Sequence, residues 1–173
     1  MENAIFEAIK KRRSIREFSD QAVSLNDLKS IVEAGIWAPS GKNNQPWRFV
    51  LITDHHIREK IGQLTLYGHI ISSCRALIAV YIDSEAMYDP VKDYMSMGAA
   101  IQNMLLTTES LGLGAVWLGQ ILKNKKQVST ELQIEDRYNL MAVLAIGYPV
   151  HRKQKSHRKD LTDFILKILE EEI

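Results

Sequence analysis

The run Ala76–Ile82 is the feature that most limits what this chain of 173 residues can fold into, because it is almost continuously apolar. A strand buried on one face alternates apolar and polar residues, whereas a strand covered on both faces is apolar throughout. The run therefore predicts a central β-strand whose sheet carries helices on both sides.

Short β-branched and aromatic runs predict three more strands, at Arg48–Thr53, Ala115–Gly119 and Met141–Gly147. Apolar residues at helical spacing predict helices between and around them. Together these patterns indicate an α+β domain with a sheet of four or five short strands, and no repeat or linker divides residues 1–173. The expected helices are residues 1–11, 24–38, 55–66, 91–111, 123–132 and a final one after Asp160.

Two of these helices carry more apolar surface than one small domain can cover. Residues 91–111 are apolar well beyond a single face, which is typical of a helix buried in the core or against another subunit. The final segment places Leu161, Phe164 and Ile165 on one helical face after a basic, polar stretch. We expect the first to lie at a subunit interface and the second to reach over a partner.

Composition excludes several classes of function. The 22 basic and 21 acidic residues leave a net charge of +1, which argues against general binding to nucleic acid or a membrane surface. Cys74 is the only cysteine, so an intrachain disulfide, a cysteine-ligated iron–sulfur cluster and a four-cysteine zinc site are excluded, and we expect a small buried hydrophobe there. No signal peptide or membrane-spanning run is visible, so the expected location is the cytoplasm.

The stretch Ala38–Trp47 predicts a rigid, polar loop. Pro39 and Pro46 restrict its backbone, while Ser40, Asn43 and their amide neighbours offer hydrogen bonds without permanent charge. Such a loop suits a flat heterocycle with ring nitrogens and carbonyls. A turn whose amides bond their own backbone is an equally good interpretation.

The stretch Arg12–Phe18 places three arginines around Ser14. A guanidinium group matches phosphate oxygens, and a serine hydroxyl adds a short donor. A solvated basic patch is the alternative. The glycines of Gly112–Gly119 do not form a dinucleotide fingerprint, because the run leads from helix into strand, but a glycine at a strand end lets a ligand approach the backbone.

The chain lacks the usual signatures of protein-based catalysis: a nucleophile elbow, a phosphate-binding lysine loop and histidines at metal-ligand spacing are all missing. We therefore expect no catalytic side chain and no metal, with the chemistry carried by a cofactor. A phosphate site, an amide-rich loop and a glycine-ended strand together describe a phosphorylated heterocycle, and flavin mononucleotide (FMN) fits.

The stretches Arg12–Phe18, Ala38–Trp47 and Gly112–Gly119 resemble, in order and separation, the three signatures of the FMN-dependent nitroreductase family. The resemblance covers essentially the whole chain. It implies that the first stretch holds the FMN phosphate and ribityl chain, that Arg16 reaches the flavin ring, and that the strand end lies near flavin N5. The FMN-binding residues it implies are Arg12, Arg13, Ser14, Arg16, Pro39, Ser40, Asn43, Trp117, Leu118, Gly119, Arg158 and Lys159.

The resemblance also implies a mostly antiparallel sheet flanked by helices, in an intertwined homodimer with FMN at the subunit interface. The implied reaction is ping-pong hydride transfer from NADH or NADPH to a nitroaromatic, a quinone or a similar small molecule. Specialised flavin chemistry on the same fold (reductive dehalogenation or flavin cleavage) and a flavin-binding module without turnover remain alternatives. Candidate residues lining the substrate pocket are Tyr67, His69, Tyr88 and Tyr94.

Overall fold

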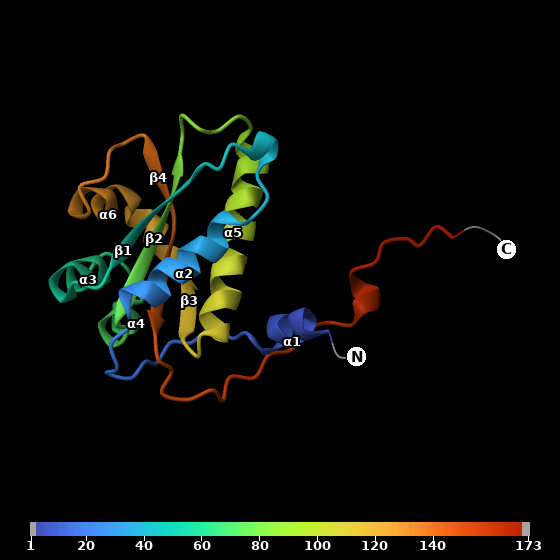
Figure 1. Cartoon of the computed structure of the whole chain (residues 1–173), viewed down its shortest axis with the longest axis horizontal. Helices are drawn as coiled ribbons and strands as arrows, with labels where there is room; N and C mark the ends of the chain where they lie inside the picture. Colours follow the sequence, from blue (N-terminus) through green and yellow to red (C-terminus); the bar gives the residue numbers. More distant parts are fainter. Residues whose placement is uncertain (1–2, 171–173) are drawn as a thin grey trace.

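The computed structural model describes residues 3–170 and contains one four-stranded sheet (Figure 1). Every neighbouring pair of strands is antiparallel, which confirms the expected α+β class. The spatial order is β1-β2-β4-β3, so β2 and β4 are central and β1 and β3 are the edges. The strands are β1 (Trp47–Ile52), β2 (Ala76–Asp83), β3 (Gly114–Leu118) and β4 (Tyr138–Gly147).

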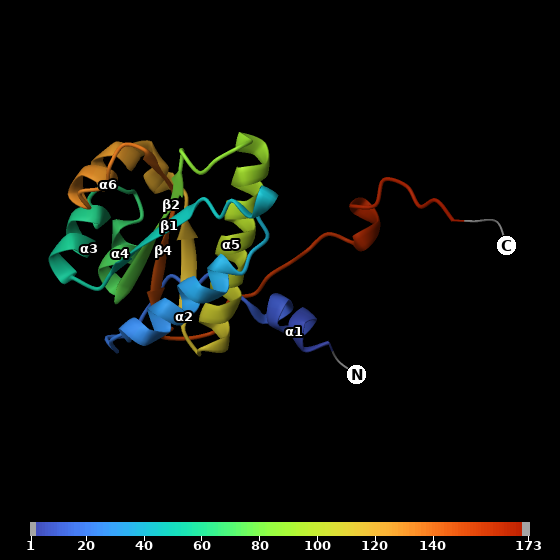
Figure 2. The same cartoon turned by 45° about the horizontal axis from the view of Figure 1, so that its top comes forward.

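Helices cover both faces of this sheet, as the apolar run in β2 predicts. Every residue of β2 is buried. Its side chains alternate: Ile78 and Val80 pack with α2 and α5, whereas Leu77 and Tyr81 pack on the opposite core, beneath α3, α4 and α6 (Figures 1 and 2). The helices are α2 (Leu25–Ile36), α3 (His55–Gly62), α4 (Gly68–Ser73), α5 (Pro90–Ser110) and α6 (Lys125–Glu131).

Side-chain caps fix where the main helices begin. The expected cap at Ser24 is present, since its hydroxyl accepts a hydrogen bond from the Asp27 amide. Asp54 caps α3 and Asp89 caps α5 in the same way, and Pro90 occupies the first turn of α5, where its missing N–H costs nothing. Short 3₁₀ turns complete the chain: η1 (Gly41–Asn43), η2 (Gln120–Asn124) and η3 (Leu161–Asp163).

Cys74 lies just before β2 and is fully buried, as expected for a small hydrophobe. Burial raises the pKa of its thiol to about 11, so the group stays protonated at neutral pH. None of the helices in residues 3–170 combines the length and apolarity that crossing a bilayer requires.

The expected final helix is wrong. After Asp160 the structure forms only the single turn η3, and the rest of the segment to residue 170 runs out from the body without helical structure (Figure 1). Its apolar side chains are exposed, including Phe164, Leu166 and Leu169. Most of an amphipathic helix's stability comes from packing its apolar face, and the part of the chain that the structure describes leaves the apolar side chains of this segment exposed.

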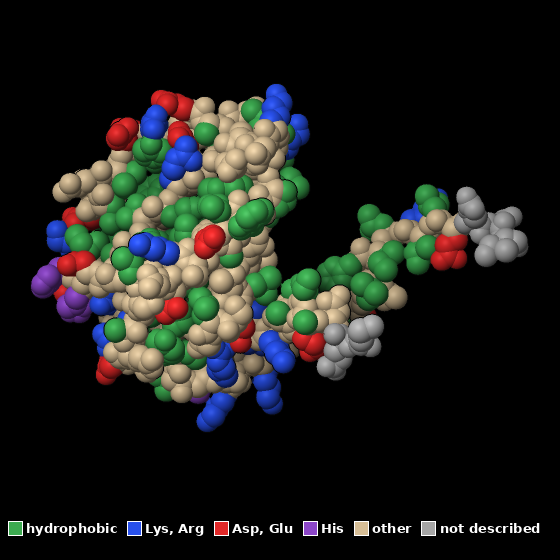
Figure 3. Space-filling view, in the orientation of Figure 1, with side chains coloured by type: hydrophobic (Ala, Val, Ile, Leu, Met, Phe, Trp, Pro, Cys, Tyr) green, Lys and Arg blue, Asp and Glu red, His purple; other side chains and the backbone are tan. Residues whose placement is uncertain are grey.

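The first helix, α1 (Ala4–Lys11), also projects from the body, beside the start of the terminal segment (Figure 2). Ile5 and Phe6 are 70% and 56% exposed. Helix α1 and the described part of the terminal extension therefore both present apolar residues to solvent, and Figure 3 shows hydrophobic side chains at several places along the extension.

Candidate functional site

The stretch Arg12–Phe18 lies against edge strand β3 and the end of β4. Ser14 pairs with Ala115 as a parallel bridge, and the Ile15 amide donates a 2.9 Å hydrogen bond to the Ala115 carbonyl. Further along, Phe18 forms a bridge with Pro149, just after β4. Two motifs separated by a hundred residues in sequence thereby become neighbours in space.

Two glycines let this segment lie so close to the sheet. Gly114 and Gly147 face each other across β3 and β4. A Cβ at Gly114 would lie 2.6 Å from Cγ1 of Ile15, and a Cβ at Gly147 would lie 2.9 Å from Cδ1 of Phe18. Any larger residue would push the arginine segment outward, so close packing explains both glycines.

A cavity of about 240 Å³ opens where this segment meets the end of β3. The structure thus brings Arg16 together with Trp117–Gly119, as the sequence predicts. Arg16 is exposed, and within residues 3–170 its guanidinium makes one long hydrogen bond, 3.5 Å from Nη1 to the Ser14 carbonyl. A Cβ at Gly119 would meet no atom within 4 Å, so the space beside it is open. The lining residues are Arg16, Tyr67, Ile70, Val116, Trp117, Leu118, Gly119 and Gln120.

The arginines of this segment differ in how many hydrogen bonds their guanidinium groups donate to the rest of the chain. The Arg12 guanidinium forms no hydrogen bond or ion pair with any residue in 3–170. Arg13, in contrast, donates to the carbonyls of Lys10, Arg12 and Gln154. Arg12 and Arg16 therefore keep donors for a ligand, while Arg13 fixes the segment to the chain that follows β4.

The loop between α2 and β1 has an unusual backbone. Lys42, Asn43 and Gln45 all have positive φ, at 52°, 55° and 47°. Left-handed backbone costs a non-glycine residue roughly 1–2 kcal/mol, and such conformations concentrate at functional sites. The loop is held in shape partly by Ser40, whose hydroxyl accepts a 3.1 Å hydrogen bond from the Gln45 amide.

A buried carboxylate that no sequence pattern singles out anchors this loop to α5. Asp93 accepts a 2.9 Å hydrogen bond from the Asn44 side chain on Oδ1 and one of the same length from each of the Tyr88 and Asp89 amides on Oδ2. Burial would raise the pKa of Asp93, but these hydrogen bonds outweigh it and hold the pKa below its ordinary value. In sequence, an acid in the first turn of a helix signals only a favourable dipole interaction.

A single chain does not bring all the predicted site residues together. The loop with Pro39, Ser40 and Asn43 lies beside the N-terminal end of α5, whereas α1 and the arginine segment lie at the opposite end (Figure 1). Arg158 and Lys159 lie on the terminal extension, where Arg158 donates to Ser156 Oγ and to the His157 carbonyl. Of the candidate pocket residues, only Tyr67 lines the Arg16 cavity.

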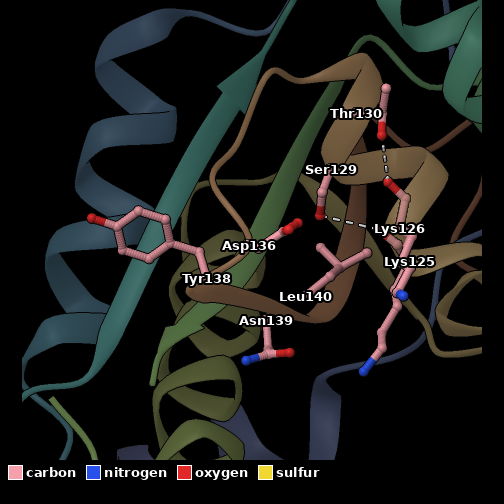
Figure 4. A pocket seen from close by; sticks show the side chains of 8 residues that line it. All are labelled: Lys125, Lys126, Ser129, Thr130, Asp136, Tyr138, Asn139 and Leu140. Carbon is pink, nitrogen blue, oxygen red and sulfur yellow. Dashed lines mark hydrogen bonds between the residues drawn. The ribbon is translucent and has the colours of Figure 1, made fainter. Parts of the chain in front are cut away.

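A second cavity, of about 410 Å³, lies between α6 and the start of β4 (Figure 4). Its Ser129 and Thr130 hydroxyls donate hydrogen bonds to the Lys125 and Lys126 carbonyls of their own helix, so their protons are not available to a ligand. None of the predicted site residues lines it, which makes the Arg16 cavity the better candidate. The lining residues are Lys125, Lys126, Ser129, Thr130, Asp136, Tyr138, Asn139 and Leu140.

Comparison with known proteins gives matches over most of the chain. The model of the nitroreductase family matches residues 9–69 and 65–148. A putative NADH dehydrogenase/NAD(P)H nitroreductase of Archaeoglobus fulgidus is 32% identical over 145 residues, which is 82% of this chain and 83% of that protein. An iodotyrosine deiodinase of Thermotoga neapolitana is 24% identical over 182 residues, and this match covers 91% of this chain and 95% of that protein.

A solved structure is also similar along nearly its full length. The crystal structure of a putative nitroreductase in complex with FMN, from Desulfovibrio desulfuricans, has a TM-score of 0.93 and 42% sequence identity. The match covers 98% of this chain and 99% of that one.

Replacing the buried anchor tests its role. Asp93→Asn puts an amide where the carboxylate accepts three hydrogen bonds, and should lower the free energy of unfolding at pH 7 by about 1–3 kcal/mol. Because folding lowers the pKa of Asp93 below 3.8, its contribution is complete well above that pH and disappears as pH falls through the folded-state value.

Urea unfolding of both proteins between pH 7 and pH 3 measures this. The difference in unfolding free energy should shrink below about pH 4.5, and a constant difference would contradict the assignment. Asp136→Asn is the control, since Asp136 is exposed and forms no ion pair within residues 3–170.

Proposed function

The chain belongs to the nitroreductase family, and from that premise we propose that it is an FMN-dependent NAD(P)H oxidoreductase that reduces nitroaromatics, quinones or similar electron-poor acceptors. The observation that carries the proposal is the convergence of Arg16 and Trp117–Gly119 on one cavity. The packing of Ile15 and Phe18 on two glycines holds the backbone on either side of Arg16 against the sheet, so the arginine is brought to the cavity before any ligand arrives.

The side chains present fit FMN. Arg12 has a guanidinium with unused donors, which matches a phosphate, and Arg16 brings a positive charge to the cavity wall. Trp117 is an aromatic residue that is 43% exposed, and Gly119 leaves open space beside the backbone. We propose Arg12, Ser14 and Arg16 as the main FMN contacts of this segment, with Arg13 holding it in place.

Bound FMN would supply the redox chemistry, taking a hydride from NAD(P)H and giving it to the acceptor in a separate half-reaction. The chain's task is then to bind and orient the two reactants in turn at one cavity, which needs no acid or base on a side chain. The guanidinium of Arg16 would stabilise negative charge that develops inside the cavity.

We propose a homodimer as the functional unit. The exposed apolar residues of α1 and of the terminal extension support it, since a monomer would leave them in water (Figure 3). The separation of the two halves of the predicted site within one chain supports it too. In the dimer, the Pro39–Asn43 loop and Arg158 or Lys159 of one protomer would complete the cavity of its partner.

Reductive dehalogenation is a second candidate, because the relative from Thermotoga neapolitana carries the name iodotyrosine deiodinase. The same cavity would serve both reactions, since each requires an aromatic molecule placed against the flavin. The acceptor that reoxidises the reduced protein distinguishes the two.

The reaction itself is tested by anaerobic stopped-flow mixing of the purified holoprotein with NADH or NADPH. Flavin absorbance near 450 nm, a general property of flavins, should bleach and then return when a nitroaromatic or quinone is added. Recovery with iodotyrosine but not with these acceptors would favour dehalogenation. A spectrum that neither reductant bleaches would refute the oxidoreductase function.

The phosphate assignment is tested by Arg12→Ala. Loss of a charge-assisted contact of roughly 1.5–3 kcal/mol should weaken FMN binding by roughly ten- to a hundredfold, so the variant should lose flavin on dialysis. Arg137→Ala is a matched control, because Arg137 pairs with Glu85 outside the candidate site. Equal flavin retention by both variants would contradict the role of Arg12.

The dimer is tested by light scattering on the holoprotein, which should give a mass of about twice the 19.8 kDa of one chain. Truncation after Lys159 removes most of the exposed apolar extension and should shift the mass toward the monomer, because that apolar contact is lost. A monomeric mass for the full-length holoprotein would contradict the proposed homodimer.

A further inference from the structure

Two lysines share one aromatic ring beside the Pro39–Asn43 loop. The Nζ atoms of Lys42 and Lys92 lie 4.9 Å and 5.2 Å from the centre of the Tyr88 ring. We propose that Lys42, Tyr88 and Lys92 form a subsite for an anionic group, a carboxylate or phosphate, carried by the molecule that reacts at the flavin. The inference rests on the proposed function and adds a selectivity to it.

The backbone around the Tyr88 ring is fixed by close packing and by hydrogen bonds. Gly41 lies directly against Tyr88, so that a Cβ at Gly41 would overlap the phenol ring. The Tyr88 amide and the Asn44 side chain both donate to the same buried carboxylate, Asp93. Lys42 comes from the loop and Lys92 from the first turn of α5, and this one anchor fixes both elements.

The charge of the group is positive. Lys92 has a partner in Asp89, with 3.6 Å between Nζ and Oδ2. Lys42 forms no ion pair with any carboxylate in residues 3–170. An aromatic face attracts both ammonium groups without neutralising them, so an anion that reaches the pair meets at least one uncompensated charge.

Its position ties the subsite to the reaction. Lys42 lies in the sequence between Ser40 and Asn43, two residues proposed to contact the flavin. Its left-handed backbone, with φ of 52°, is part of the strained turn that gives the loop its shape. In the proposed dimer, the Lys42 ammonium group would therefore come from the same turn as two of the residues proposed to contact the flavin.

The anion has two possible sources, the acceptor and the 2′-phosphate of NADPH. For the acceptor, 4-nitrobenzoate and 4-nitrobenzamide form a pair of similar shape that differs in charge. For the reductant, NADPH and NADH form the equivalent pair. The measured quantity is the ratio of kcat/KM within each pair, which cancels effects common to both members.

The variants are Lys42→Met, which keeps an unbranched side chain on the ring but removes the charge, and Lys42→Glu, which reverses the charge. Loss of a charge-assisted contact should lower the ratio in one pair about tenfold for Lys42→Met, and further for Lys42→Glu. The affected pair identifies the source of the anion. Lys125→Met is the control, because Lys125 lies on α6 at the other cavity, and it should leave both ratios unchanged.

Tyr88 acts as a positioning residue in this scheme. Tyr88→Phe keeps the ring face and should keep the ratio, whereas Tyr88→Leu removes the face and should lower it. A purely structural role for the lysines and the ring would slow both members of each pair alike. Unchanged ratios in both pairs for both Lys42 variants would therefore overturn the proposal.

A binding measurement separates this proposal from the proposed function. Isothermal titration of the protein as purified should show tighter binding of 4-nitrobenzoate than of 4-nitrobenzamide, or of NADPH than of NADH, and Lys42→Met should abolish that difference. This outcome supports the subsite even if NAD(P)H fails to bleach the flavin, which would refute only the oxidoreductase function. Equal affinities within both pairs for the wild-type protein overturn the subsite whatever the kinetics show.

Discussion

Burial of β2 on both faces is the constraint from which the rest of the arrangement follows. A strand with no exposed side chain needs a neighbour on each side and a helical layer above and below. These demands are met by β1 and β4, by α2 and α5 on one face, and by α3, α4 and α6 on the other. A sheet so enclosed leaves its edges and ends as the places where a ligand can reach the backbone.

At the β3 edge of the sheet, the Arg12–Phe18 segment contributes the positively charged side chains of the candidate site. Backbone pairing with Ala115 fixes its register, and the facing glycines Gly114 and Gly147 allow its side chains to pack against the sheet. Arg16 reaches its cavity as a consequence of this packing. The guanidinium groups thus depend on contacts made by Ile15 and Phe18, which are apolar and carry no chemistry themselves.

At the other end of α5, a single buried carboxylate organises the loop. Asp93 has three donors and a lowered pKa, so it is charged at neutral pH and gathers Asn44, Tyr88 and Asp89 around it. A fixed carboxylate can hold three positive-φ residues in a conformation that they would not keep alone. The same anchor places Lys42 and Lys92 over one ring, which links the strain in the loop to a concentration of positive charge.

Sequence alone determined the strands, the helix cap at Ser24 and the three motifs, because each depends on neighbours within one element: the apolar run of β2, the hydroxyl of Ser24, the arginines around Ser14. The apolar spacing after Asp160 also predicts a helix, and this prediction is wrong because helix stability depends on packing the apolar face, which stays exposed in residues 161–170. The family resemblance implied that Arg16 and Trp117–Gly119 meet, but only the tertiary structure decided which packing brings them together and that Asp93 is a buried anchor rather than a surface acid. Those facts depend on contacts between residues dozens of positions apart, and no local pattern encodes such contacts.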